Sequence, residues 1–141
     1  MISNIQEHHN EEEIQKMTME GDAWLWREEL EFYLKEIDFY LLLISSGVIR
    51  ETGSNKDINY LLKKFQKIKE SNELYLETCI QYQCKLPQVK ECDDVQCDNA
   101  FLKSHILFKN KLEEHFQEIR NIKQSAFMLL KDSIEEAKIK R

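Results

Sequence analysis

Apolar residues recur at alternating spacings of three and four along most of this 141-residue chain. The first such stripe has seven members: Ala23, Trp26, Leu30, Tyr33, Ile37, Tyr40 and Ile44. These spacings place every member on one face of an α-helix, as in the a and d positions of a heptad. Asp22 precedes the stripe as a candidate N-cap, and Gly47 follows it as a candidate C′ residue. We therefore predict a first helix over residues 22–46.

Two further stripes with the same spacing predict two more helices. The second consists of Ile58, Leu61, Phe65, Ile68, Asn72, Tyr75, Cys79, Tyr82 and Leu86. The third consists of Phe101, His105, Phe108, Leu112, His115, Ile119, Ile122, Ala126, Leu129 and Ser133. Ser54 and Asp98 are candidate N-caps, and Pro87 ends the second helix because proline disfavours helical backbone in the residue before it. The predicted helices cover residues 55–86 and 98–138.

Short connections between long helices make consecutive helices antiparallel neighbours. We predict an all-α, antiparallel up-down-up three-helix bundle with coiled-coil-like heptad packing, forming one domain over residues 1–141. Residues 1–21 are a polar segment that either precedes the first helix or extends it. Without that extension the first helix would be roughly 37 Å long, against roughly 60 Å for the third. A third helix that overhangs leaves apolar residues uncovered, and a second copy of the chain is the simplest partner for them.

The composition agrees with long helices and narrows the class of protein. Three glycines and one proline are too few for the turns of a β-sandwich or barrel. The longest uncharged apolar stretch, residues 39–49, is shorter than the ~20 residues of a membrane-spanning helix. The first twenty residues contain no apolar signal segment, so we expect a cytoplasmic protein. A net charge of −6 leaves no basic excess over the whole chain, which argues against a nucleic-acid partner.

The four cysteines form a C-x4-C-x7-C-x4-C pattern centred on Gln88: Cys79, Cys84, Cys92 and Cys97. Because Pro87 marks the predicted turn, residue pairs 79/97 and 84/92 would be nested across one helical hairpin. Such a site could hold zinc through four thiolates, although x4 is at the upper edge of the usual ligand spacing. The alternatives are two disulfides, which a reducing cytoplasm disfavours, and four free thiols.

Polar residues interrupt the second and third stripes, among them one asparagine and two histidines. Asn72 at a core position is typical of a residue that fixes helix register, unless the local geometry turns it outward. His105 and His115 lie about 15 Å apart along one helix, too far to share a metal ion, so we interpret them as partly buried polar residues.

The first predicted helix carries more apolar side chains than one core-facing stripe can use. Trp24, Phe32, Phe39 and Leu42 lie off its stripe. A helix that is apolar on every side is buried on every side, whereas a three-helix bundle leaves one face of each helix wet. The surplus therefore indicates a surface for a partner, unless these residues are ordinary scattered exposed apolar groups.

The segment Trp24-Leu25-Trp26-Arg27-Glu28-Glu29-Leu30-Glu31-Phe32-Tyr33-Leu34-Lys35-Glu36-Ile37 is followed in the third predicted helix by Glu114-His115-Phe116. These two short motifs resemble small bacterial helical proteins of uncharacterised function, which share a W-L-x-x-L-x-F-Y-x-x-E-I start and a later E-H-F-type element. The resemblance implies a helical, coiled-coil-like protein and transfers no active site.

The functional prediction is a non-enzymatic scaffold or protein-interaction module that self-associates. No glycine-rich phosphate loop, nucleophile elbow or distinct carboxylate pair occurs in the sequence. The alternative is a metal-binding or redox module that uses the cysteine cluster, with zinc as its cofactor.

Overall fold

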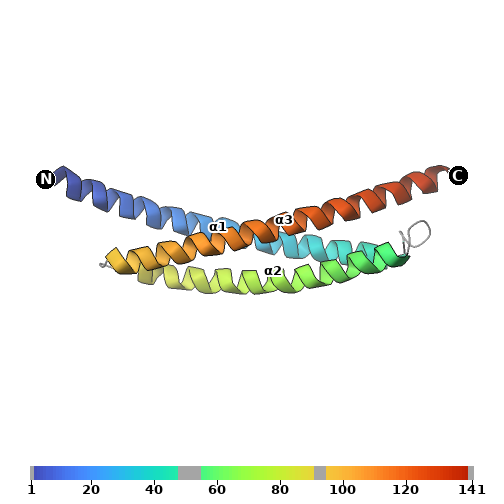
Figure 1. Ribbon diagram of the computed structural model, residues 1–141, viewed down its shortest axis with the longest axis horizontal. Helices are drawn as coiled ribbons and strands as arrows, with labels where there is room; N and C mark the ends of the chain where they lie inside the picture. The colour runs from blue at the N-terminus through green and yellow to red at the C-terminus, as the bar shows by residue number, and fades with distance from the viewer. Residues whose placement is uncertain (1, 48–54, 91–94, 140–141) are drawn as a thin grey trace.

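The computed structural model describes residues 2–47, 55–90 and 95–139, and this part of the chain is entirely helical apart from a short turn. Three helices follow one another: α1 covers Ile2–Ser45, α2 covers Asn55–Lys90 and α3 covers Val95–Ile139. Figure 1 shows α1 and α3 running in one direction and α2 returning in the other. The predicted all-α class and the number of helices are confirmed.

The first helix is longer than the apolar stripe predicted. The polar N-terminal segment extends α1 back to Ile2, so Asp22 lies in the middle of a helix and its prediction as an N-cap is wrong. With 44 residues in α1 and 45 in α3, the predicted mismatch in helix length disappears. The opposite end follows the prediction, because Gly47 adopts a φ of 92°, the left-handed conformation expected of a C′ glycine.

The hairpin between α2 and α3 lies further along the chain than predicted. α2 continues through Pro87 to Lys90, so the prediction that Pro87 ends the helix is wrong. Within the last turn, proline removes only the N–H that would bind the carbonyl of Gln83. α3 begins at Val95, so Asp98 lies inside its first turn and is not its cap.

The helices do not pack equally closely. α1 and α2 share the most extensive backbone contact, α3 contacts α2 less, and α3 contacts α1 least. The close approach of α1 and α2 occurs at two small residues, Ala23 and Cys79. The Sγ atom of Cys79 lies 3.4 Å from the carbonyl oxygen of Ala23. Large aromatic residues separate α3 from its neighbours, because the distance between helix axes follows the side chains at the contact. The N-terminal end of α1 and the C-terminal end of α3 extend beyond the other helices at opposite ends of the molecule (Figure 1).

The core consists of the residues that the three stripes identified. Every stripe member is buried or half-buried, and most of them form one continuous cluster between the three helices. Met19, Ala23 and Leu86 form a smaller second cluster where α1 passes the end of α2. The apolar spacing in the sequence therefore predicts correctly which face of each helix lies inside.

Candidate functional site

A buried chain of hydrogen bonds joins all three helices near the middle of the molecule. The amide nitrogen of Asn72 donates to the carbonyl oxygen of Leu30 at 2.8 Å, which connects α2 to α1. The Nε2 atom of His115 lies 2.9 Å from the Asn72 amide oxygen, which connects α3 to α2. Because a carbonyl oxygen only accepts, the amide orientation is determined, and His115 must donate from Nε2. The polar core position predicted for Asn72 is confirmed, and its side chain is completely buried.

The environment of His115 keeps its imidazole neutral. Burial lowers the pKa of His115 from 6.5 to about 4. Its ring packs against the ring of Tyr75, with a centroid distance of 4.7 Å, and no carboxylate contacts it in the described part of the chain. Neutral His115 has one N–H, which the hydrogen bond to Asn72 uses. This group therefore serves to align the helices.

A second polar chain joins the three helices closer to the α2–α3 hairpin. His105 Nε2 lies 2.9 Å from the Asp22 carboxylate, and His105 Nδ1 lies 2.6 Å from the Tyr82 hydroxyl. Burial, reinforced by the nearby Asp22 charge and by Cys79, raises the pKa of Tyr82, so the phenol keeps its proton and donates to Nδ1. His105 then donates from Nε2 to the carboxylate.

This Asp22–His105–Tyr82 chain has the residue types of a catalytic relay but the surroundings of a core. His105 is 4% exposed, and the ring of Trp26 covers it at a centroid distance of 4.8 Å. Phe108 packs against Trp26 at 5.6 Å and completes the aromatic cover. Neither His105 nor Tyr82 lines the grooves found on the described surface. The arrangement supports a role in helix alignment.

The hairpin between α2 and α3 has a different register from the one that the cysteine spacing suggested. Two hydrogen bonds connect α2 to α3, Tyr82 with His105 and Asn72 with His115. In each pair the mean of the two residue numbers is 93.5, so the hairpin is centred between residues 93 and 94 and not on Gln88. The chain therefore turns after Lys90 and not beside Gln88, because Pro87 does not terminate α2.

The two cysteines that the structure describes are free thiols in different surroundings. Cys79 is buried against α1, and burial raises the pKa of its thiol to about 11, whereas Cys84 is exposed. A zinc ligand must be a thiolate, which the surroundings of Cys79 disfavour. The side chains of Cys92 and Cys97 lie outside the part of the chain that the structure describes. Among the described residues, no group of three or more His, Cys, Asp or Glu side chains could hold a metal ion.

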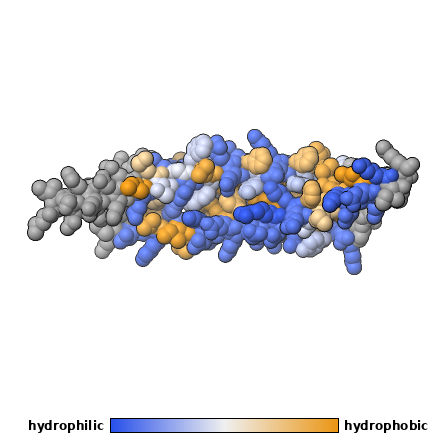
Figure 2. Space-filling model, turned by 90° about the horizontal axis from the view of Figure 1, so that it is seen from above, coloured by the Kyte–Doolittle hydropathy of each residue, from blue (hydrophilic) through white to orange (hydrophobic). Residues whose placement is uncertain are grey.

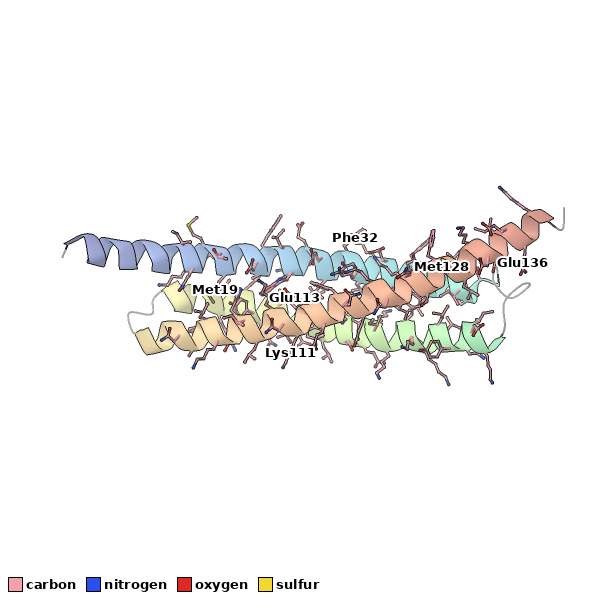
Figure 3. The ribbon with its side chains drawn as sticks, turned by 45° about the horizontal axis from the view of Figure 1, so that its top comes forward. Met19, Phe32, Lys111, Glu113, Met128 and Glu136 are labelled. Carbon is pink, nitrogen blue, oxygen red and sulfur yellow. The ribbon has the colours of Figure 1, made fainter. Side chains whose placement is uncertain are left out.

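The four surplus apolar residues of the first helix are all exposed. Trp24 is 55%, Phe32 59%, Phe39 58% and Leu42 70% exposed. Ile14, Met17 and Leu25 are exposed as well, and helical spacing places them on the same side. We call these seven residues the outer face of α1. Figure 3 shows Phe32 on the side of α1 that faces away from α2, whereas Met19 lies between the two helices.

The outer face is the main concentration of exposed apolar side chains. Of fourteen large exposed apolar residues in the described chain, seven belong to α1, two to α2 and five to α3. The face of the molecule seen from above is largely hydrophilic with separate apolar patches (Figure 2). Leu25 was not among the predicted surface residues, although it lies seven residues before Phe32, as Phe32 lies seven before Phe39, and this spacing was a usable signal.

A groove between α2 and α3 is one of the concave features of the described surface. Its volume is about 300 Å³, and its lining includes Leu61, Ile68 and Ile122 beside two lysines and several polar groups. One of these lysines, Lys64, lies 5.1 Å from the ring centroid of Tyr60 at the rim. Because the lining is mixed, the outer face of α1 is the stronger candidate for contact with a protein.

No family model matches the chain, and no curated protein or solved structure shows significant similarity to it. The structure by itself defines a small all-helical protein. The resemblance to small bacterial helical proteins therefore stays a prediction. None of the described helices combines the length and apolar character needed to cross a bilayer.

Proposed function

We propose that this protein is a non-enzymatic scaffold that binds another protein through the outer face of α1. The proposal includes a coiled-coil-like, antiparallel up-down-up bundle as the rigid body that presents this face. The observation that carries it is the two-sided character of α1, with one apolar side buried in the core and the opposite one exposed. Contiguous exposed apolar surface on a folded protein marks interaction sites.

The buried polar groups support a scaffold rather than a catalyst. Asn72, His105 and His115 each hydrogen-bond to groups on neighbouring helices. A buried polar network whose members satisfy one another specifies one register between helices. A single register keeps the outer face in one geometry. The free thiols of Cys79 and Cys84 agree with a reducing compartment, and we propose a cytoplasmic location.

The experiment that tests this function compares proteins captured from a cell extract by three versions of the chain. Phe32→Glu with Phe39→Glu places charge in the outer face, and Leu74→Glu with Leu107→Glu is the matched control on α2 and α3. All four side chains are at least half exposed, so both variants should keep the wild-type helical signal and melting temperature.

We expect at least one protein to be captured by the wild type and by the control, and lost with the outer-face variant. Quantitative mass spectrometry of the captured proteins measures this difference. Identical sets from all three versions would contradict the proposed function.

A further inference from the structure

The outer face of α1 repeats symmetrically about Phe32. Leu25 lies seven residues before Phe32 and Phe39 lies seven residues after it, so the three side chains follow one line along the helix. All three are more than half exposed. When a second α1 crosses this line in the opposite direction at Phe32, each Leu25 meets a Phe39 of the other copy. The apolar pattern is therefore complementary to itself.

Between Asp22 and Leu42, most acidic residues of α1 are engaged in contacts within the molecule. Four acid contacts account for this: Asp22 with His105 (2.9 Å), Glu31 with Arg27 (3.1 Å), Glu36 with Lys123 (3.0 Å) and Asp38 with Lys69 (2.8 Å). Between Asp22 and Leu42, three charged groups remain without a hydrogen bond or ion pair to the described part of the chain: Glu28, Glu29 and Lys35. All three are exposed.

These three charges flank Phe32 on the outer face. Glu28 and Glu29 lie four and three residues before Phe32, and Lys35 lies three residues after it. Residues three and four apart are neighbours on a helix surface. An antiparallel crossing at Phe32 places each Lys35 beside Glu28 of the other copy, because these two residues lie on the same side of the line through Leu25, Phe32 and Phe39. A parallel crossing places like charges together, which is destabilising.

We infer that the outer face of α1 binds a second copy of this chain, with the two α1 helices antiparallel and Phe32 at the two-fold axis. This inference rests on the proposed function and names the partner. A two-fold interface uses the same patch on both chains, which requires a self-complementary surface such as this one. Because one helix face is a small interface, we expect dissociation constants in the micromolar range.

Charge reversal in the purified full-length chain tests both the partner and the orientation. Glu28→Lys places two positive residues together in each half of the dimer, and Lys35→Glu places negative residues together. We expect either change to raise the dissociation constant about tenfold, since it converts two exposed attractions into repulsions. The double variant restores attraction, so its dissociation constant should lie within about threefold of the wild type. Glu77→Lys, an exposed charge reversal on α2, is the matched control and should leave association unchanged.

Sedimentation equilibrium from about 5 to about 500 µM measures these constants. A one-to-one mixture of Glu28→Lys and Lys35→Glu chains should associate at least as tightly as the wild type, because position 35 of each chain then faces an opposite charge at position 28 of the other chain. A wild type that stays monomeric over this range overturns the inference. Association that the double variant does not restore overturns the antiparallel geometry. The proposed function is decided separately, by whether the outer-face variant loses proteins from the extract.

Discussion

The pH dependence of stability should report directly on the buried histidine His115. Its pKa is about 4 in the folded chain, against 6.5 when it is unfolded. Between these values the unfolded chain binds a proton that the folded chain does not, so the free energy of unfolding falls as the pH falls. The loss is about 1.4 kcal/mol per pH unit, or about 2 kcal/mol between pH 6.5 and pH 5. The contribution is fully present above pH 6.5, and its loss levels off below pH 4.

A His115→Gln variant isolates this contribution from the carboxylates, which also titrate in acid. Glutamine keeps an N–H donor for the Asn72 oxygen and does not titrate. Urea titrations followed by far-UV circular dichroism at about pH 7.5 and about pH 5 give the free energies of unfolding. We expect the advantage of the wild type over the variant to shrink by about 2 kcal/mol at the lower pH. A difference that stays constant between the two pH values would refute the assignment of a neutral, buried His115.

Three further predictions concern other positions. Gly21→Ala should raise the melting temperature and add about 0.5–1 kcal/mol to the free energy of unfolding, because a Cβ there meets no atom within 4 Å. Gly47→Ala should lower both the melting temperature and the free energy of unfolding, because a residue with a Cβ is strained at a φ of 92°. Asn72→Leu should lower the free energy of unfolding, measured in urea, by about 2–3 kcal/mol, because it removes the acceptor of the His115 N–H. The double variant Asn72→Leu with His115→Leu should recover most of this loss, and an equal loss in the single and double variants would contradict the pairing. Iodoacetamide should modify Cys84 before Cys79, because the thiolate fraction of Cys79 is about a hundredfold below that of an ordinary thiol. Peptide mass spectrometry measures the two labelling rates, and equal rates would contradict the burial of Cys79.

The apolar spacing was sufficient to identify the core because it repeats over many turns. Stripes of seven to ten members average out single exceptions, so even the polar members Asn72, His105 and His115 are buried as their positions predicted. The same spacing separated Trp26, which is in the core, from Trp24, which is exposed. In contrast, each helix boundary depended on one or two residues. Asp22 suits an N-cap chemically, but a favourable helix propensity on both sides of it continues α1, and its carboxylate instead binds His105.

Pro87 shows why the turn between α2 and α3 was misplaced. The nested cysteine pairing required the chain to turn beside Gln88, and a proline makes that turn plausible locally. The register of α2 against α3 is decided by contacts far apart in sequence, namely Tyr82 with His105 and Asn72 with His115. Such pairs have no local signature, since a histidine in a stripe does not indicate which residue on another helix it will contact.

By itself, the sequence determined that this chain forms three long helices, which side of each helix lies inside, and that the first helix has more apolar surface than one core uses. These properties depend on local periodicity, which a helix of 3.6 residues per turn converts directly into faces. The tertiary structure alone decided where the helices end, how α3 aligns with α2, and that Asp22, His105 and Tyr82 join into one chain. The physical reason is that register is determined by hydrogen bonds and packing between helices, where the partners are separated by many residues.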